Sequence, residues 1–239
     1  MTATGQRCIA IIPARRESKR IPRKNIVLLG GEHLIAYTLR AARNAENISR
    51  LVVTTDDEEI ARISAEQGAE VLYPRPPELS TDTASTVDVL RYAVHALESE
   101  VSDLDPVVLL QPTSPFRKGQ DIDAAIELFF TTGADTVTAV RHVTEHAWWQ
   151  WQANGDRIVP LYTFGHLAMG RHQLPQHYIE SGAIYVIRRF TLFRDGLYGP
   201  KVVPFVMGSV ESIDIDEPLD LLWAEFLLSQ CTVKSENRL

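Results

Sequence analysis

The chain has 239 residues and a formal net charge of −7, with 45% hydrophobic and 23% charged residues. This composition suits one globular α/β domain with an ordinary core, and the acidic balance argues against general binding to nucleic acid. No run approaches the ~18 consecutive apolar residues of a membrane span, and the first residues show no signal-peptide pattern. We therefore expect a cytoplasmic protein with no membrane partner.

The first predicted element is a buried strand at residues 8–12, an apolar run rich in β-branched residues. We expect Cys8 to be a buried free thiol in this strand and not the disulfide partner of the distant Cys231. Residues 13–25 follow, and six of these thirteen are Arg or Lys. Positive charge gathered past a strand end of an acidic protein indicates an anion site, and a triphosphate fits, with Ser18 and Asn25 as neutral donors. The alternative is a solvated basic loop.

Apolar strand-like runs and helical patterns alternate along the rest of the chain. We expect strands at residues 51–55, 70–73, 106–111, 136–140, 182–187 and 202–207. We expect helices at residues 87–98, 122–130 and 218–229, and another that follows the capping pair 56–57 and ends at residue 67. This β-α-β rhythm predicts a Rossmann-like α/β fold, in which a doubly wound, mostly parallel sheet forms one domain over residues 1–239.

Residues 141–178 interrupt this rhythm and are predicted to form an inserted arm. The segment holds Trp148, Trp149 and Trp151, and Asn154-Gly155 is a hairpin-turn signal. Because exposed apolar patches on monomers are usually small, so much aromatic area on an excursion needs a partner surface. We expect a homodimer formed through this arm. The alternative is that the tryptophans fold back onto their own domain.

Two aspartates near the end of the chain form a candidate metal site. In Ser212-Ile-Asp-Ile-Asp216, an extended segment would place Asp214 and Asp216 on the same side. Two carboxylates on one face repel each other unless a hard cation neutralises them, and Mg²⁺ would bridge them to phosphate oxygens. The alternative is that Asp216 caps the helix that follows.

Several polar side chains at predicted strand ends and turns are further candidates. Gln111 ends a buried strand, so its amide either reads a base or sugar or stabilises the turn. Arg75 lies between prolines and is similarly placed. Thr86, with its hydroxyl neighbours, either contacts a ligand or caps a helix. Arg171 is the anion binder of the polar cluster 171–176.

These pieces, in this order, resemble the acylneuraminate cytidylyltransferase family, the CMP-sialic acid synthetases. The matching motifs are Ala14-Arg-x-x-Ser-Lys-x-Ile-Pro-x-Lys-Asn25, Arg75-Pro-x-Glu-Leu-Ser80, Asp82-Thr-Ala-Ser85, Leu110-Gln-Pro-Thr-Ser-Pro115, Arg171-x-Gln-Leu-Pro-Gln176, Gly182-Ala-Ile-Tyr185 and Ser212-Ile-Asp-Ile-Asp216. Together they cover nearly the whole chain. The opening motif and the Asp-Ile-Asp motif are the most specific.

The resemblance implies a nucleotidyltransferase that joins CTP and an acidic keto-sugar to give CMP-sugar and pyrophosphate. It implies that the triphosphate is held by Arg15, Ser18, Lys19, Lys24 and Asn25. It assigns the cytidine to Arg75, Thr86 and the backbone near Ala14, and Mg²⁺ or Mn²⁺ to Asp214 and Asp216. It places Gln111, Tyr185 and Arg171 against the sugar, with Arg171 supplied by the partner subunit of a homodimer.

The identity of the sugar stays open at this point. Ser181 stands where many members carry Asn, and the tryptophans at 148–151 stand where some members carry a sugar-binding lysine. N-acetylneuraminic acid, legionaminic acid, pseudaminic acid and an eight-carbon ulosonic acid are all candidates. A nucleotide-binding regulator without activity is the alternative from another class, and the retained pairs Asp214/Asp216 and Lys19/Lys24 argue against it.

Overall fold

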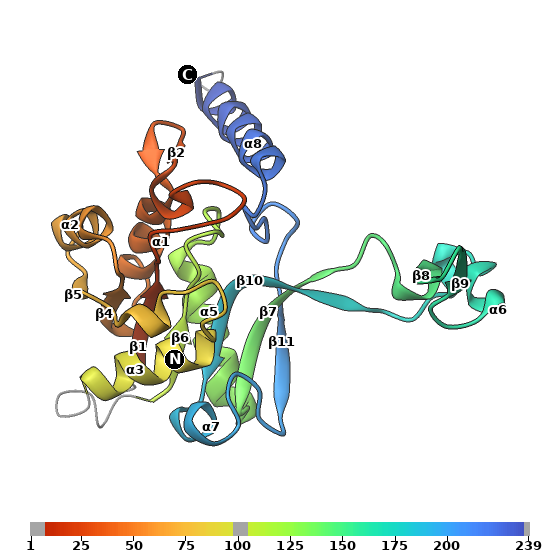
Figure 1. The fold of residues 1–239 in the computed structure, drawn as a ribbon, viewed down its shortest axis with the longest axis horizontal. Helices are drawn as coiled ribbons and strands as arrows, with labels where there is room; N and C mark the ends of the chain where they lie inside the picture. Colours follow the sequence, from red (N-terminus) through yellow and green to blue (C-terminus); the bar gives the residue numbers. More distant parts are fainter. Residues whose placement is uncertain (1–7, 98–104, 237–239) are drawn as a thin grey trace.

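The computed structural model describes residues 8–97 and 105–236, with side chains through residue 230, and shows a seven-stranded sheet flanked by helices (Figure 1). From one edge to the other the strands are β11 (Val202–Val206), β7 (Thr136–His142), β10 (Tyr178–Ile187), β6 (Val107–Leu109), β1 (Cys8–Pro13), β4 (Ile48–Thr54) and β5 (Glu70–Leu72). Neighbouring strands are parallel except at β10, which is antiparallel to both β6 and β7. The predicted mostly parallel α/β fold is confirmed.

Helices cover both faces of the sheet, and the central strand β1 is apolar on both. Ala10 and Ile12 pack into the core under α1 (Leu34–Arg43), α2 (Glu58–Glu66) and α5 (Gly119–Thr132). Ile9 and Ile11 face the opposite core, under α3 (Thr86–Ala96) and α7 (Arg189–Arg194). A strand buried on both faces has no polar side, and this explains the continuous apolar run in the sequence.

The parallel strands β1, β4 and β6 end at the same edge of the sheet, and the loops that follow them carry most of the predicted site residues. At this edge α2 begins where Asp57 Oδ1 accepts hydrogen bonds from the backbone N–H groups of Glu59 and Ile60. Asp57 is therefore the cap within the predicted pair 56–57. In the same way, Ser85 Oγ caps α3 by accepting from Val87 N at 3.2 Å.

Residues 143–177 leave the sheet between β7 and β10 and project far from the body of the molecule (Figure 1). The projection contains the hairpin of β8 (Trp151–Asn154) and β9 (Arg157–Pro160), and the short helix α6 (Phe164–Leu167). Its base is a β7–β10 ladder in which Tyr178 pairs with His142. Residues 141, 142 and 178 of the expected arm therefore belong to sheet strands, and we call residues 143–177 the arm.

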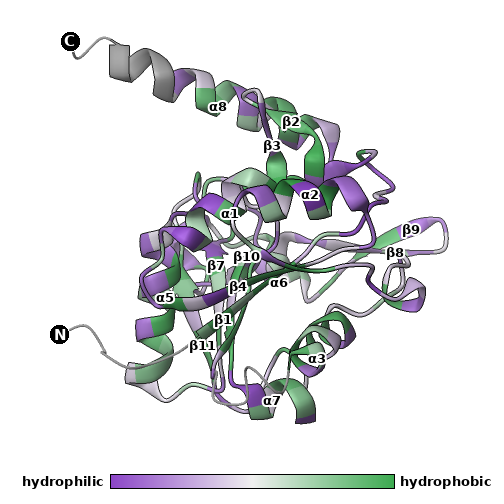
Figure 2. Cartoon of the chain, turned by 90° about the vertical axis from the view of Figure 1, so that its left-hand side faces the viewer, coloured by the Kyte–Doolittle hydropathy of each residue, from purple (hydrophilic) through white to green (hydrophobic). Residues whose placement is uncertain are grey.

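The long helix α8 (Pro218–Glu236) stands at one end of the molecule beside β2 (Leu28–Leu29) and β3 (Glu32–His33) (Figure 2). A small core joins them, in which Ala224 of α8 packs with Leu29 and Leu34. Among the described residues, no helix combines the length and apolar character needed to cross a membrane.

Every predicted strand and helix is present, with most ends within four residues of the prediction, but α8 runs seven residues past its predicted end at residue 229. The expected end of one helix at residue 98 lies outside the described residues, as does the side chain of Cys231. Cys8 is buried and free, as predicted. Helices α1 and α7 and the β2–β3 hairpin were not anticipated.

Candidate active site

A cleft of about 310 Å³ opens at the sheet edge where β1 and β6 end. It is lined by Pro13, Arg15, Glu17, Ser18, Lys24, Asn25, Arg75, Leu79, Thr81, Asp82, Ala84, Thr86, Val89, Gln111, Pro112 and Thr113. Seven of the predicted site residues are in this set, drawn from four segments of the chain. Such a position, outside the carboxyl ends of parallel strands, is where open α/β sheets bind ligands.

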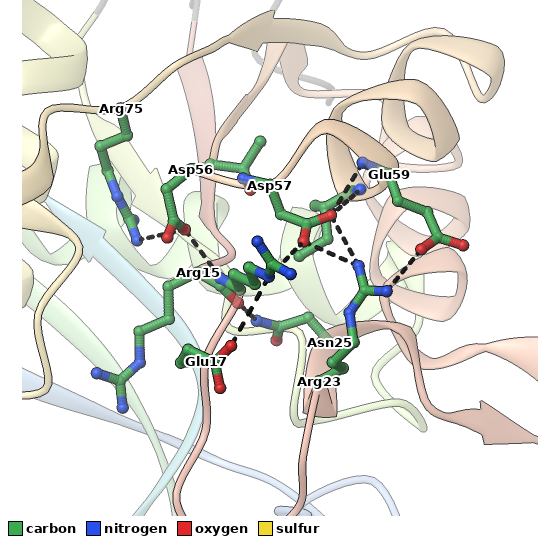
Figure 3. Close-up of polar contacts among 11 residues, drawn as sticks. Arg15, Glu17, Arg23, Asn25, Asp56, Asp57, Glu59 and Arg75 are labelled. Carbon is green, nitrogen blue, oxygen red and sulfur yellow. Dashed lines mark hydrogen bonds and ion pairs between the residues drawn. The ribbon is translucent and has the colours of Figure 1, made fainter.

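Part of the basic loop is fastened to the start of α2 (Figure 3), and its residues Arg16 and Arg23 do not line the cleft. Arg23 adopts a left-handed backbone conformation with φ of 52°. Its guanidinium contacts both oxygens of Asp57, at 2.8 and 3.0 Å, and Glu59 at 2.8 Å. The backbone N–H of Arg16 donates to Asp56 at 2.8 Å. These contacts hold the unusual loop conformation in place.

Two cations of the loop converge on one carboxylate at the cleft. Asp82 accepts Arg15 Nη1 at 2.7 Å and Lys19 Nζ at 2.9 Å. The hydrogen bond from Lys19 and the charge of Arg15 lower the pKa of Asp82 below its ordinary value. Asn25 supports this arrangement from below, because its Nδ2 donates to the Arg15 carbonyl at 2.8 Å and its side chain is buried. Two cations and one anion leave a net positive charge here, which suits a polyphosphate.

Asp216 is held by two other cations of the same loop. Its Oδ1 accepts Lys24 Nζ at 2.7 Å and its Oδ2 accepts Arg20 Nη1 at 3.3 Å. The alternative that Asp216 caps the following helix finds no support among the described residues, because the hydrogen bonds of its carboxylate go to Lys24 and Arg20 and none goes to a backbone N–H. At the start of α8 it is Asp220 Oδ2 that accepts backbone N–H groups, those of Asp216 and Glu217. The loop and the Asp-Ile-Asp segment are thus brought together across nearly the whole chain.

Asp214 is the more enclosed member of the aspartate pair. Burial raises the pKa of Asp214, and the negative charge of Asp216 adds to this, although Thr113 donates a hydrogen bond to it. Its Oδ1 is buried and has no hydrogen-bond partner. A buried carboxylate oxygen without a donor is the chemistry that a hard cation satisfies. The described residues contain no cluster of three acidic, His or Cys ligands, so phosphate oxygens and water would complete the coordination.

Gln111 and Asp214 meet at Gly182, in the irregular part of β10. A Cβ atom at Gly182 would lie 2.6 Å from Gln111 Oε1 and 3.9 Å from Asp214 Oδ2, and its φ is +73°. Only glycine leaves room for the Gln111 side chain at this point. Ile215 N also donates to the Thr113 carbonyl at 2.8 Å, which ties the Asp-Ile-Asp segment to the turn after Gln111.

Two of the three residues predicted for the cytidine, Arg75 and Thr86, line the cleft, and Ala14 does not. Arg75 is buried, its guanidinium lies 3.7 Å from Asp56, and burial lowers its pKa. Thr86 lines the cleft, while the capping of α3 falls to Ser85. Ala14 is fully buried and does not line the cleft. Its backbone N–H donates to the Thr54 carbonyl at 3.0 Å.

Tyr185 lies in β10, close to Asp214 but outside the cleft lining. Burial and the charge of Glu180 raise the pKa of Tyr185 to about 12. Glu180 Oε2 accepts the Tyr185 hydroxyl at 3.5 Å, and its Oε1 accepts the Tyr198 hydroxyl at 2.6 Å. Glu180 and Asp214 line one further cavity, of about 430 Å³.

Arg171 is not brought to the cleft of its own chain. It lies in the arm, where its guanidinium stacks over Trp149 with its carbon 5.6 Å from the ring centroid. Both residues line a separate cavity of about 220 Å³, which shares no lining residue with the cleft. The arm has its own stacked aromatic contacts, such as Trp148 on His166 at 3.9 Å between ring centroids.

Two residues of the site were missed by the sequence analysis. Asp82 was quoted in a motif without a role, and only the folded chain shows that it bridges Arg15 and Lys19. Arg117 was not singled out, since a lone arginine after a proline-rich turn carries no motif signal. It is 3% exposed and donates to the carbonyl of Gln111.

Comparisons with known proteins agree with this geometry. The family model described as "Cytidylyltransferase" matches residues 9–156. The chain is 33% identical to the CMP-N,N'-diacetyllegionaminic acid synthase of Legionella pneumophila, over 93% of this chain and 96% of that protein. It is 31% identical to an N-acylneuraminate cytidylyltransferase of Escherichia coli, over 89% of this chain and 50% of that protein, so it spans about half of that relative. A solved CMP:2-keto-3-deoxy-manno-octonic acid synthetase in complex with CTP has the same fold, with a TM-score of 0.69 and 18% identity over 95% of this chain and 99% of that one.

Proposed function

Since the chain belongs to the cytidylyltransferase family, we propose that it transfers CMP from CTP to an acidic keto-sugar of the nonulosonic class. The sugar's anomeric hydroxyl attacks the α-phosphate, the bond from this phosphorus to the β-phosphate oxygen breaks, and pyrophosphate leaves. The observation that carries this proposal is the cleft that gathers Arg15, Lys24, Arg75 and Gln111 at one sheet edge. Legionaminic acid is the preferred acceptor, because the relative from Legionella matches almost end to end.

The triphosphate is bound by the basic loop. Arg15 and Lys19, now paired with Asp82, supply positive charge for its outer phosphates. Ser18 and Asn25 also line the cleft and offer neutral donors. Lys24, which is 14% exposed and lies between the cleft and Asp216, faces the reacting phosphate.

The nucleoside end of CTP lies against Arg75 and Thr86, which both line the cleft. The buried guanidinium of Arg75 has fixed donors for the carbonyl of a pyrimidine base. The backbone near Ala14 would contact the cytidine through groups other than the Ala14 N–H, which donates to the Thr54 carbonyl.

Asp214 and Asp216 would hold Mg²⁺ or Mn²⁺. The partnerless buried Oδ1 of Asp214 fits this role, and Asp216, which now contacts Lys24 and Arg20, would be the second carboxylate ligand. When bound, the ion neutralises charge on the phosphate oxygens. The Lys24 ammonium stays within the cleft to stabilise charge on the α-phosphate.

The acceptor sugar lies on the Gln111 side, between the cleft and Tyr185 of β10. Gln111 offers a donor and an acceptor to the sugar. Arg171 lies in the arm, outside the cleft of its own chain. In a homodimer it would therefore bind the carboxylate of the sugar that is held in the site of the second copy. Phosphoryl transfer of this kind relies on positioning and electrostatic stabilisation, and no covalent enzyme nucleophile is needed.

The direct test is pyrophosphate release from CTP with a panel of acidic sugars: legionaminic, pseudaminic, N-acetylneuraminic and an eight-carbon ulosonic acid. We expect turnover with a nine-carbon sugar, fastest with legionaminic acid, and none without a sugar. A different preferred nine-carbon sugar would correct the acceptor only. CTP binding without pyrophosphate release for any sugar would instead support a regulator that lacks activity.

A further inference from the structure

Arg117 is a buried cation beneath the cleft that pairs with no carboxylate among the described residues. Its side chain is 3% exposed. Removing a guanidinium from water is costly unless hydrogen bonds replace its hydration. Burial lowers the pKa of Arg117, yet a guanidinium stays protonated at neutral pH. A fold that keeps such a charge buried needs it for a specific set of acceptors.

Those acceptors come from three separate parts of the fold. Nη1 donates to the Ala183 carbonyl of β10, and both terminal nitrogens lie 3.3 Å from the Gln111 carbonyl. Nη2 also donates to Thr38 Oγ1 of α1 at 2.6 Å. Nε has no partner. The guanidinium therefore clamps β10 and α1 to the end of β6.

The clamp lies next to the contact between Gln111 and Gly182. Ala183 follows Gly182 directly, and Gln111 Oε1 occupies the space where a Cβ at Gly182 would stand, at 2.6 Å. The two carbonyls that Arg117 holds therefore belong to Gln111 itself and to the neighbour of Gly182. A shift of either would move the Gln111 amide relative to Asp214, which is also adjacent to Gly182.

We propose that Arg117 is a positioning residue, which acts by holding the Gln111 backbone and the irregular part of β10 at a fixed separation so that the Gln111 amide stays aimed at the acceptor sugar. This inference rests on the proposed function, in which Gln111 contacts the sugar. A lysine cannot take this role, because its single ammonium lacks the planar fork that reaches three acceptors at once.

A double-mutant cycle with Arg117→Lys and Gln111→Ala tests the proposal, with kcat and KM measured separately for the sugar and for CTP. We expect Arg117→Lys to lower kcat/KM for the sugar about tenfold, a loss of about 1.4 kcal/mol of transition-state stabilisation, and to leave KM for CTP within about twofold. In the Gln111→Ala background, the same substitution should cost less than about twofold, because coupled residues are not additive.

Arg91→Lys is the matched control. Arg91 also donates to backbone carbonyls, of Leu192 at 2.9 Å and Phe193 at 3.1 Å, but it joins α3 to α7 and does not line the cleft. We expect Arg91→Lys to leave both sugar constants unchanged even where it lowers Tm. A merely structural role for Arg117 would make the two lysine variants alike.

Three results would overturn the inference. The first is that the losses of kcat/KM for the sugar from Arg117→Lys and Gln111→Ala multiply fully in the double variant. The second is that Arg117→Lys lowers kcat/KM for CTP as much as for the sugar, and the third is that it leaves the sugar kinetics unchanged. If Gln111→Ala alone has no effect, the proposed role of Gln111 fails as well. Should Arg117→Lys not fold, Thr38→Val replaces it, since it keeps the side-chain shape and removes the hydroxyl that accepts from Arg117 and donates to the Gln111 carbonyl at 3.4 Å. It should cost about threefold for the sugar, about 0.65 kcal/mol, and nothing further in the Gln111→Ala background.

Discussion

The cleft and the arm differ in how their charged and aromatic groups are satisfied. At the cleft, Arg15 and Lys19 share Asp82, while Lys24 contacts Asp216, so each cation has a carboxylate partner within one chain. In the arm, the Arg171 guanidinium lies over Trp149 and has no carboxylate partner among the described residues, and Phe164 is 71% exposed. Under the proposed function, the nucleotide half of the site would form within one chain, whereas the arm would be covered by a second copy.

The strongest way to break the cleft is to remove the charge of both aspartates. We expect Asp214→Asn with Asp216→Asn to lower Mg²⁺-dependent pyrophosphate release by about 10³-fold, because no carboxylate is left to hold the cation. Undiminished activity in this double variant would rule out the metal site.

The single variant Asp214→Asn provides a control for folding. The burial of Asp214 in the wild type disfavours the charged carboxylate, so the folded protein gains stability when this charge is removed. In EDTA at pH 7 we expect Tm to rise by about 2–4 °C, which corresponds to roughly 1 kcal/mol for a domain of this size. The half-exposed Asp216 should give no such rise in Asp216→Asn.

A smaller effect is expected from one cation of the loop. Lys19→Ala should reduce kcat/KM for CTP by about 10²-fold, the scale of losing one preorganised contact to developing charge. Arg16→Ala is the matched control. Neither side chain lines the cleft itself, but Lys19 contacts the cleft residue Asp82, whereas Arg16 lies against Asp57 at the start of α2. Equal losses in the two variants would mean that general positive charge matters and that the assignment of Lys19 to the triphosphate is wrong.

The arm is tested by mixing two variants that are inactive for different reasons. We expect Arg171→Ala and the Asp214→Asn, Asp216→Asn double variant to recover activity after subunit exchange. Random assortment of two-fold dimers gives about a quarter of the wild-type sites. No recovery despite demonstrated exchange, or a monomeric mass in solution, would show that each chain works alone.

The smallest effect concerns Tyr185, which lies in the body of the sheet, where β10 pairs it with Leu109 of β6 and Thr138 of β7. Its folded pKa is raised to about 12 from 10.0, so the unfolded chain ionises first and stability falls as pH rises through this window. Tyr185→Phe should lessen that fall by up to about 1.4 kcal/mol per pH unit. Urea unfolding at pH 9 and pH 11 measures the free energy of unfolding of both proteins. An equal fall between the two pH values in the wild type and in Tyr185→Phe would contradict the raised pKa of Tyr185.

Much of the fold was predictable because its signals are local. The apolar run before Pro13, the capping by Asp57 and the turn at Asn154-Gly155 each depend on neighbouring residues, and the structure confirms all three. The elements that were missed are short or lack a distinct pattern, such as the six-residue α7. Such segments are set by packing against the rest of the chain and not by their own preference.

The amino-acid sequence by itself determined the type of sheet, the basic loop after β1 and the acidic pair near α8, because periodicity and charge density are properties of nearby residues. Only the tertiary structure decided that Asp82 bridges Arg15 and Lys19, that Asp216 forms an ion pair with Lys24, and that Arg117 donates to the Gln111 carbonyl. These contacts join residues far apart in the chain. Their partners are chosen by the crossing of strands and loops at one sheet edge, which no local pattern records.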